Sequence, residues 1–265
     1  MDRLKRRIQI KSKSVPILEF DPSRKAYFHP KPKYSFRGRK FHERVVLNFF
    51  ADVVKKLVRE KKARLIAVFR SEMGEHPAYE VKSNGKLLSV VHPGIGSALA
   101  AGFLDEAIAM GGRKFIACGG AGVLQKDLTV GRLIIPTSAI RDEGASYHYL
   151  PPGREVKPHA KAVSAIKKTL KKNGYDFITG KTWTTDGFYR ETFNKVKLRK
   201  KEKCLSVEME CAALFSVAKF RKVQLGQILY SGDDLSGEKH DDRNWHHHSI
   251  RERLFWLAAE ACSSL

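Results

Sequence analysis

The sequence predicts an α/β fold, a single domain in which a twisted central mixed β-sheet is flanked by helices. Short apolar runs alternate with amphipathic stretches along most of the chain, which is typical of strands that alternate with helices. Glycine-rich turns follow two of the apolar runs. No linker or internal repeat divides the 265 residues, and a hydrophobic content of 42% is enough for one large core.

The stretch 89–122 is the part around which the rest of the fold is expected to be organised. An apolar run ends at Val91 and leads into Gly94 and Gly96, and a helix is expected to begin at Ser97. The backbone N–H groups of such a loop, together with the helix N-terminus, can bind an anion. The third glycine of a dinucleotide-binding motif is missing, so the loop is not a Rossmann fingerprint.

A second glycine turn, which contains Gly120 and Gly122, is expected after the apolar run 115–118. We expect the strands at 87–91 and 115–118 to be neighbours in a parallel sheet. Both loops would then open at the carboxyl edge of that sheet, which is where ligands bind in this class of fold.

The remaining elements follow from the same patterns. Residues 1–40 are expected to form a basic N-terminal strand, at 15–20, and a connector that belongs to the domain whose body is 41–265. Asn84-Gly85 predicts a hairpin, because both positions tolerate positive φ. The other expected strands are 64–69, 131–136, 177–181, 204–207 and 224–230, and the other expected helices are 41–61, 160–172, 209–220 and 250–261.

The formal net charge of +22 is high for an enzyme that acts on a small molecule. The basic runs, among them an expected loop at 195–203, alternate with acids and lack the interleaved aromatics of a base-stacking surface. We therefore expect a solvated basic surface that binds nucleic acid only non-specifically. His246, His247 and His248 are sequential and are expected to form an exposed patch rather than a metal site.

The four cysteines show neither C-x-x-C nor a paired spacing, so neither a zinc site nor a disulfide framework is indicated. The basic N-terminus lacks the apolar region of a secretion signal, and no apolar run approaches the length of a membrane span. The expected location is the reducing cytoplasm.

Five blocks follow one another along the chain: PGIGSALAAGFLDEAIAMG, CGGAGVLQKDLTVGRLIIPTSAIRDEGASYHYLPP, TWTTDGFYRET, VEMECAALFSVAKF and GDDL. Over about residues 87–262 this ordered set resembles the nucleoside phosphorylase family, which includes uridine phosphorylase and the hexameric purine nucleoside phosphorylases. The resemblance implies a twisted central sheet that binds a nucleoside and an anion. It also implies cleavage of the glycosidic bond by phosphate, or by water in the nucleosidase branch.

The resemblance implies a role for each matching residue. Glu210, with Met209, is at the position that holds the ribose hydroxyls, and Glu208 is where the family lines the nucleoside pocket. Phe188 matches the aromatic residue that packs on the base or the sugar. Asp233 matches the aspartate that supports protonation of the leaving base in purine-cleaving members.

The chemistry of the residues agrees with these roles. Breaking a glycosidic C–N bond builds positive charge on the sugar and negative charge on the base. A carboxylate such as Glu210 accepts hydrogen bonds from two vicinal hydroxyls better than a neutral side chain does. Structural alternatives stay open: Glu208 and Glu210 would also suit a helix N-terminus, and Asp233 would suit an N-cap or an Asx-turn.

The chain departs from the family at the anion and at the base. Phosphorolytic members carry an arginine and a Ser or Thr where this chain has Ala117 and Gly120, and Asp21-Pro22-Ser23-Arg24 resembles the N-terminal phosphate loop. The glutamine and arginine that read uracil are replaced within residues 190–192. The groups expected to bind phosphate or other parts of the substrate through the glycine loops and the N-terminus are Gly94, Gly96, Gly120, Gly122 and Arg24.

The expected activity is that of a nucleoside phosphorylase with inorganic phosphate as co-substrate and with no metal or redox cofactor. Whether the base is uridine-like or a purine stays open. The alternatives are a nucleosidase that uses water and a non-catalytic nucleoside- or RNA-binding protein that kept the fold. A homo-oligomer, dimer or hexamer, is expected, with the long 137–153 loop at its interface.

Overall fold

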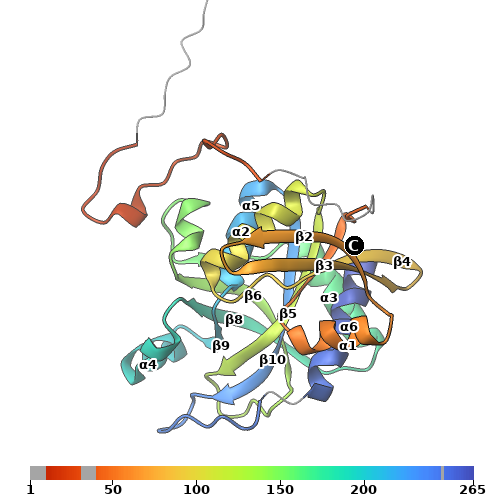
Figure 1. Cartoon of the computed structure of the whole chain (residues 1–265). Helices are drawn as coiled ribbons and strands as arrows, with labels where there is room; N and C mark the ends of the chain where they lie inside the picture. The colour runs from red at the N-terminus through yellow and green to blue at the C-terminus, as the bar shows by residue number, and fades with distance from the viewer. Residues whose placement is uncertain (1–9, 31–39, 246–247) are drawn as a thin grey trace, which may run out of the picture.

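The computed structural model describes residues 10–30, 40–245 and 248–265 (Figure 1). The strands are β1 Arg44–Asn48, β2 Arg64–Ser71, β3 Gly74–Ser83, β4 Lys86–Val91, β5 Lys114–Val123, β6 Leu133–Asp142, β7 Glu155–Val156, β8 Phe177–Thr185, β9 Cys204–Glu208 and β10 Gln224–Asp234. The α-helices are α1 Ala51–Arg59, α2 Ser97–Ala109, α3 Ala160–Lys172, α4 Phe193–Lys201, α5 Cys211–Arg221 and α6 His248–Ser264. Short 3-10 helices lie at η1 Pro16–Leu18, η2 Ala145–His148 and η3 Phe188–Arg190.

The described strands form one mixed sheet in the order β10-β6-β8-β9-β5-β1-β4-β3-β2, with β7 paired to β6. Strand β1 runs parallel to both β4 and β5, whereas β9 is antiparallel to β5 and parallel to β8. Because β10 also pairs with β5, the strands β5, β9, β8, β6 and β10 close into a barrel from which the other strands extend. The predicted α/β fold with a twisted mixed sheet is confirmed.

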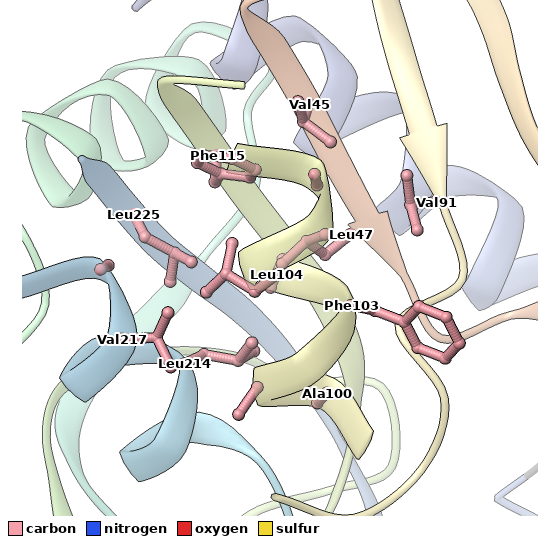
Figure 2. Packing of buried hydrophobic residues seen from close by; sticks show 14 of the residues in the cluster. Val45, Leu47, Val91, Ala100, Phe103, Leu104, Phe115, Leu214, Val217 and Leu225 are labelled. Atoms are coloured by element: carbon pink, nitrogen blue, oxygen red, sulfur yellow. The ribbon is translucent and has the colours of Figure 1, made fainter. Parts of the chain in front are cut away.

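Helices cover both faces of the sheet (Figure 1). On one face α2 packs against α5, and on the other α6 contacts α1 and α3. Figure 2 shows how α2 sits in the first of these layers, with its apolar side chains between β1 and α5; the residues are Phe103 and Leu104 of α2, Val45 and Leu47 of β1, and Leu214 and Val217 of α5. Burial of such side chains is the main stabilising contribution to the fold.

The helix expected at 41–61 is wrong in its first half. Strand β1 takes Val45, Val46 and Leu47, all fully buried, and α1 begins only at Ala51. A central parallel strand is covered on both faces, so its apolar residues are consecutive, and such a run imitates the apolar positions of a helix. Strand β1 also lies between β4 and β5, so the strands before the two glycine loops are not neighbours.

Two further expectations are corrected. Residues 15–20 contain no strand, because Pro16–Leu18 forms the short helix η1 with exposed or half-buried side chains. The basic run at 195–203 lies largely in helix α4, which Thr192 caps by accepting a hydrogen bond from the Lys195 N–H. Its Arg199 is buried against Asp142 and Glu202, and these ion pairs compensate for the charge repulsion along the helix.

The hairpin at Asn84-Gly85 is confirmed, with positive φ at both residues between β3 and β4. The helix expected at 160–172 has the bounds of α3. None of the helices in the described part of the chain is long and apolar enough to cross a membrane. The predicted patch at His246, His247 and His248 cannot be compared, since residues 246 and 247 lie outside the described residues.

Candidate functional site

The glycine N–H groups of the loop after β4 are both hydrogen-bonded within the protein. Gly94 and Gly96 have φ of 77° and 88°, a region that glycine adopts without strain. The Gly94 N–H donates to Nδ1 of His92 at 3.1 Å, and the Gly96 N–H donates to Oε1 of Glu210 at 2.6 Å. Both N–H groups that were expected to face an anion therefore already have partners. Gly96 is also the N-cap of α2, so Glu210 lies at the N-terminus of that helix.

The Glu208 carboxyl caps the N-terminus of α5 by accepting hydrogen bonds from its backbone N–H groups. Its Oε2 accepts hydrogen bonds from the N–H groups of Glu210 and Cys211 at 2.7 and 2.6 Å, and its Oε1 accepts one from Oγ1 of Thr184 at 2.6 Å. Thr184 in turn accepts a hydrogen bond from the Ala212 N–H at 2.9 Å. The structural alternative, a carboxylate at a helix N-terminus, thus describes Glu208 well.

Glu210 is buried beside Glu208 but caps nothing on its own helix. It is the N-cap residue of α5 by position, and its side chain instead reaches across to the Gly96 N–H of α2. The Met209 carbonyl also bonds to α2, accepting from Oγ of Ser97 at 2.6 Å. The helix N-termini of α2 and α5 therefore meet at Met209 and Glu210, with one carboxyl group between them.

Burial makes both carboxyl groups weak acids. Burial is the main cause that raises the pKa of Glu208, to about 7, against the hydrogen bonds from Thr184 and the backbone, which lower it. Burial and then the nearby charge of Glu208 raise the pKa of Glu210 to about 8. Perturbed pKa values cluster at functional sites, so Glu210, which has no capping role on its own helix, is the candidate functional group of the two.

Asp233 lies near the end of β10 and faces β5. Its Oδ2 is 3.0 Å from Nε2 of His240, and a Cβ on Gly122 would be 3.3 Å from its Oδ1. Gly122 is the register partner of Val207, the residue before Glu208, so strand β5 lies between β10, which carries Asp233, and β9, which carries Glu208. A Cβ at Gly122 would also lie 2.7 Å from Cδ1 of Leu235, so that side chain would have to shift.

Phe188 is at the rim of this region rather than in a core. It begins η3, keeps 49% of its surface exposed, and packs on Tyr189 with ring centroids 4.0 Å apart. Tyr189 is itself 88% exposed. Phe188 is therefore not a core residue, and its exposed aromatic pair with Tyr189 suits contact with the flat ring of a substrate.

The turn expected at Gly120 and Gly122 is wrong, because these residues lie in strand β5. Strand β5 continues through Gly120 and Gly122 to Val123, paired with β9 and β10. A Cβ on Gly120 would lie 3.0 Å from the ring of Tyr230, its register partner on β10. The aromatic ring thus occupies the space of the side chain that phosphorolytic relatives carry, and Ala117 is fully buried in the core.

Arg24 is not brought to these residues. Its guanidinium lies 5.7 Å from the ring centroid of Phe220, near the C-terminal end of α5, whereas Glu210 is at the N-terminal end. A cavity of about 390 Å³ lies near the N-terminus of α2, between that helix and η2, and reaches Asp186. A larger cavity of about 680 Å³, lined mainly by α3 and α6, touches none of the candidate residues, so its size does not make it the site.

A sequence profile described as the phosphorylase superfamily matches residues 44–262 of the chain. The chain belongs to the phosphorylase superfamily. The matched region includes the loop after β4 and the elements that carry Phe188, Glu208, Glu210 and Asp233.

Curated members of the superfamily that resemble this chain carry three different names. A guanosine phosphorylase of Halorubrum lacusprofundi is 26% identical over 63% of this chain and 72% of its own length. A uridine phosphorylase of Treponema pallidum is 31% identical over 54% of this chain and 59% of its own. A DeoD-type purine nucleoside phosphorylase of Exiguobacterium sibiricum is 31% identical over 58% of this chain and 67% of its own length.

Solved structures of the superfamily share the fold at lower identity. A uridine phosphorylase of Vibrio fischeri superposes with a TM-score of 0.71 at 20% identity, over 87% of this chain and 100% of its own. An AMP nucleosidase of Bacteroides thetaiotaomicron superposes with a TM-score of 0.70 at 22% identity, over 84% of this chain and 88% of its own. These likenesses show the fold.

Sequence reasoning did not find Thr184, His92 or His240 as parts of the site. Each acts through a partner far along the chain or around a loop. Thr184 lies in the TWTTDGFYRET block, but nothing in the local sequence distinguishes it from the neighbouring threonines. Glu191 was noticed only as a substitution in the base-reading segment. It is partly buried near Asp233, and burial followed by that charge raises its pKa to about 7.

Proposed function

We propose that this member of the phosphorylase superfamily is a nucleoside phosphorylase, which cleaves the N-glycosidic bond of a nucleoside to free base and ribose 1-phosphate. The observation that carries the proposal is the buried carboxyl of Glu210 between the N-termini of α2 and α5, fixed by the Gly96 N–H. A group held in this way can bind the ribose hydroxyls and stabilise positive charge that develops on the sugar.

The carboxyls of Glu208 and Glu210 form one region and that of Asp233 a second, and we assign the first to the sugar of a nucleoside and the second to its base. Glu210 and Met209 serve the sugar, and Glu208 fixes the turn that presents them by holding the N–H groups of residues 210 and 211. Asp233 serves the base from β10, on the other side of β5, and Phe188 offers an exposed ring face. Negative charge develops on the leaving base, so an acid there lowers the barrier.

Phosphate is the proposed nucleophile, with water as the alternative. The high positive charge of the chain favours an anionic co-substrate. The filled space at Gly120 and the occupied N–H groups of Gly94 and Gly96 favour water. The AMP nucleosidase fold neighbour belongs to the hydrolytic branch by name, and so hydrolysis remains the second candidate.

The proposal includes a homo-oligomer, dimer or hexamer, in the cytoplasm. Small residues of α2 and the helix η2 line the cavity of about 390 Å³, and such a depression suits a neighbouring subunit. The loop expected at 137–153 begins only after Asp142, where β6 ends, and η2 lies within it. All four cysteines are free and buried, which fits a reducing compartment.

A nucleoside panel tests the proposal. Adenosine, guanosine, inosine, uridine and cytidine are each incubated with the protein, with and without phosphate, and release of the free base is followed. Phosphate-dependent release from at least one nucleoside, lost in the Glu210→Gln variant, is the expected result. Salt-dependent RNA binding without release of any base would instead support a non-catalytic protein.

A further inference from the structure

The cavity of about 680 Å³ lies at the opposite edge of the sheet from the candidate site. Its volume is within the range of binding sites for small molecules. Among its lining residues are Lys114 and Gln224, which are the first residues of β5 and β10 and are register partners. Gly122 and Asp233 lie near the other end of the same two strands. The cavity is therefore separate from the candidate site.

Helix α3 presents a basic face to this cavity. It packs against α6 on one face of the sheet (Figure 1). Lys161, Lys168 and Lys172 line the cavity, and their spacings of seven and four residues place them on one face of the helix. Lys167 and Lys171, on the same helix, do not line it. Because α3 contains no acidic residue, nothing within the helix offsets the repulsion between its lysines.

Two of the ammonium groups at the cavity have no acidic partner. No hydrogen bond or ion pair to Nζ of Lys161 or Lys168 is found among the described residues. Nζ of Lys172, in contrast, is 2.7 Å from Oε1 of Glu260, and this hydrogen bond holds the pKa of Glu260 below its ordinary value. Glu260 also lines the cavity, but its charge is already balanced by Lys172. The cavity therefore carries an excess of positive charge.

Other groups at the cavity add to this excess and supply neutral hydrogen-bonding atoms. Lys114 shares the carboxylate of Glu43 with Arg44, at 3.0 and 2.6 Å, so two cations are balanced by one anion. Three polar side chains without a hydrogen-bond partner among the described residues also line the cavity: Ser164, Thr169 and Gln224. Hydroxyl and amide groups can both donate and accept hydrogen bonds, as the sugar and base of a nucleotide require.

We propose that this cavity is a second binding site, which takes a nucleotide with its oligophosphate chain on Lys161 and Lys168. Seven residues of helix correspond to a rise of about 10 Å, so a row of two or three phosphates can pair with both ammonium groups at once. A single phosphate would have to draw the two side chains together, at a cost in side-chain entropy. The inference is independent of the proposed function, because the cavity shares no residue with the candidate site.

Isothermal titration calorimetry with inorganic triphosphate, at low ionic strength, measures the site. We expect the wild type to bind, and the Kd to rise at least tenfold in the double variant Lys161→Gln/Lys168→Gln, which loses both unpaired charges. The double variant Lys167→Gln/Lys171→Gln is the matched control, because it loses the same charge from the same helix outside the cavity. Its Kd should change by less than about twofold.

ATP in the same assay distinguishes a nucleotide from a free oligophosphate. Its base and ribose can reach the neutral polar side chains of the cavity, so ATP should bind more tightly than inorganic triphosphate. Weaker binding of ATP, with inorganic triphosphate bound as expected, would overturn the nucleotide as the ligand.

Ser164→Glu tests the cavity without removing a lysine. The new carboxylate stands four residues before Lys168, the favoured order for an ion pair on a helix, and so it neutralises the site from within the chain. We expect binding of triphosphate to be lost while Tm stays unchanged or rises. A Ser164→Glu variant that binds as the wild type does would overturn the placement of the phosphates.

Three other results would also overturn the inference. The first is no binding of triphosphate or ATP by the wild type. The second is an equal loss in the two double variants, which would show general attraction to a basic surface, as with RNA. The third is loss of binding in Glu210→Gln, which would place the phosphates at the candidate site.

The proposed function is tested apart from this site. Without triphosphate, Lys161→Gln/Lys168→Gln should cleave nucleosides at the wild-type rate. A wild type that releases no base but binds triphosphate through Lys161 and Lys168 would overturn the proposed function and support this inference.

Discussion

Replacing Glu210 by glutamine should make the protein more stable and less active at the same time. The amide keeps the shape of the side chain and an oxygen that can accept the hydrogen bond from the Gly96 N–H, which is 2.6 Å long in the wild type. It removes a carboxyl whose ionisation is opposed by burial and by the neighbouring Glu208. A group that can ionise beside the sugar is lost, but the folded chain no longer has to hold a buried acid.

The sign of the stability effect follows from the pKa values. The ordinary pKa of a glutamate is 4.5, and that of Glu210 in the folded chain is raised to about 8. Above pH 4.5 the unfolded chain releases the proton that the folded chain retains, so the wild type loses stability as the pH rises towards 8. Each pKa unit corresponds to about 1.4 kcal/mol. The stability gap is the free energy of unfolding of Glu210→Gln minus that of the wild type. This gap should be about 3 kcal/mol larger at pH 8 than at pH 5.

Urea unfolding of both proteins at pH 5 and pH 8, at one protein concentration, measures this difference. A constant gap between wild type and variant, or a gap that narrows as the pH rises, would refute the reasoning that Glu210 is a buried acid held against its ordinary pKa. Matched measurements on Glu238→Gln, which changes the charge by the same amount at an exposed position, correct for the general effect of net charge.

Three further predictions concern activity and assembly. Glu210→Ala should remove turnover in a protein that stays folded, because it raises the barrier by on the order of a few kcal/mol, and an unchanged kcat/KM would exclude Glu210 from the site. Asp233→Asn should slow cleavage of purine nucleosides by about 100-fold or more at neutral pH and that of uridine little; a large loss with uridine would contradict the role given to Asp233. Light scattering should find an oligomer in the active protein, and a catalytically active monomer would count against a shared site.

The fold class could be predicted because local signals agreed with it in most of the chain. The Asn84-Gly85 hairpin and helix α3 depend on turn and capping residues that are close together in the sequence. Strand β1 could not be separated from α1, since apolar residues that face two helical layers have no period of two. The helix at 193–201 depends on Asp142, which is more than fifty residues away.

Site residues could be predicted only where several of them stand close together in the sequence. Glu208 to Glu210 form such a block, and the structure brings Glu210 and Gly96 together from positions 114 residues apart. The pairing of Thr184 with Glu208 and of His240 with Asp233 depends on the register and the turn geometry of the folded chain. The expected glycine turn failed because β10 pairs with Gly120 and β9 pairs with Gly122, and the local sequence reveals neither partner.

The identity of the second product tests the central claim most directly. The nucleoside that is cleaved best is incubated with the protein first in phosphate-free buffer and then with phosphate restored, and the sugar product is identified by phosphorus NMR and by an assay for reducing sugar. The proposed phosphorylase gives no turnover without phosphate and forms ribose 1-phosphate, in step with free base, when phosphate is present. Full activity without phosphate, with free ribose as the sugar product, would contradict the account and make the protein a hydrolase.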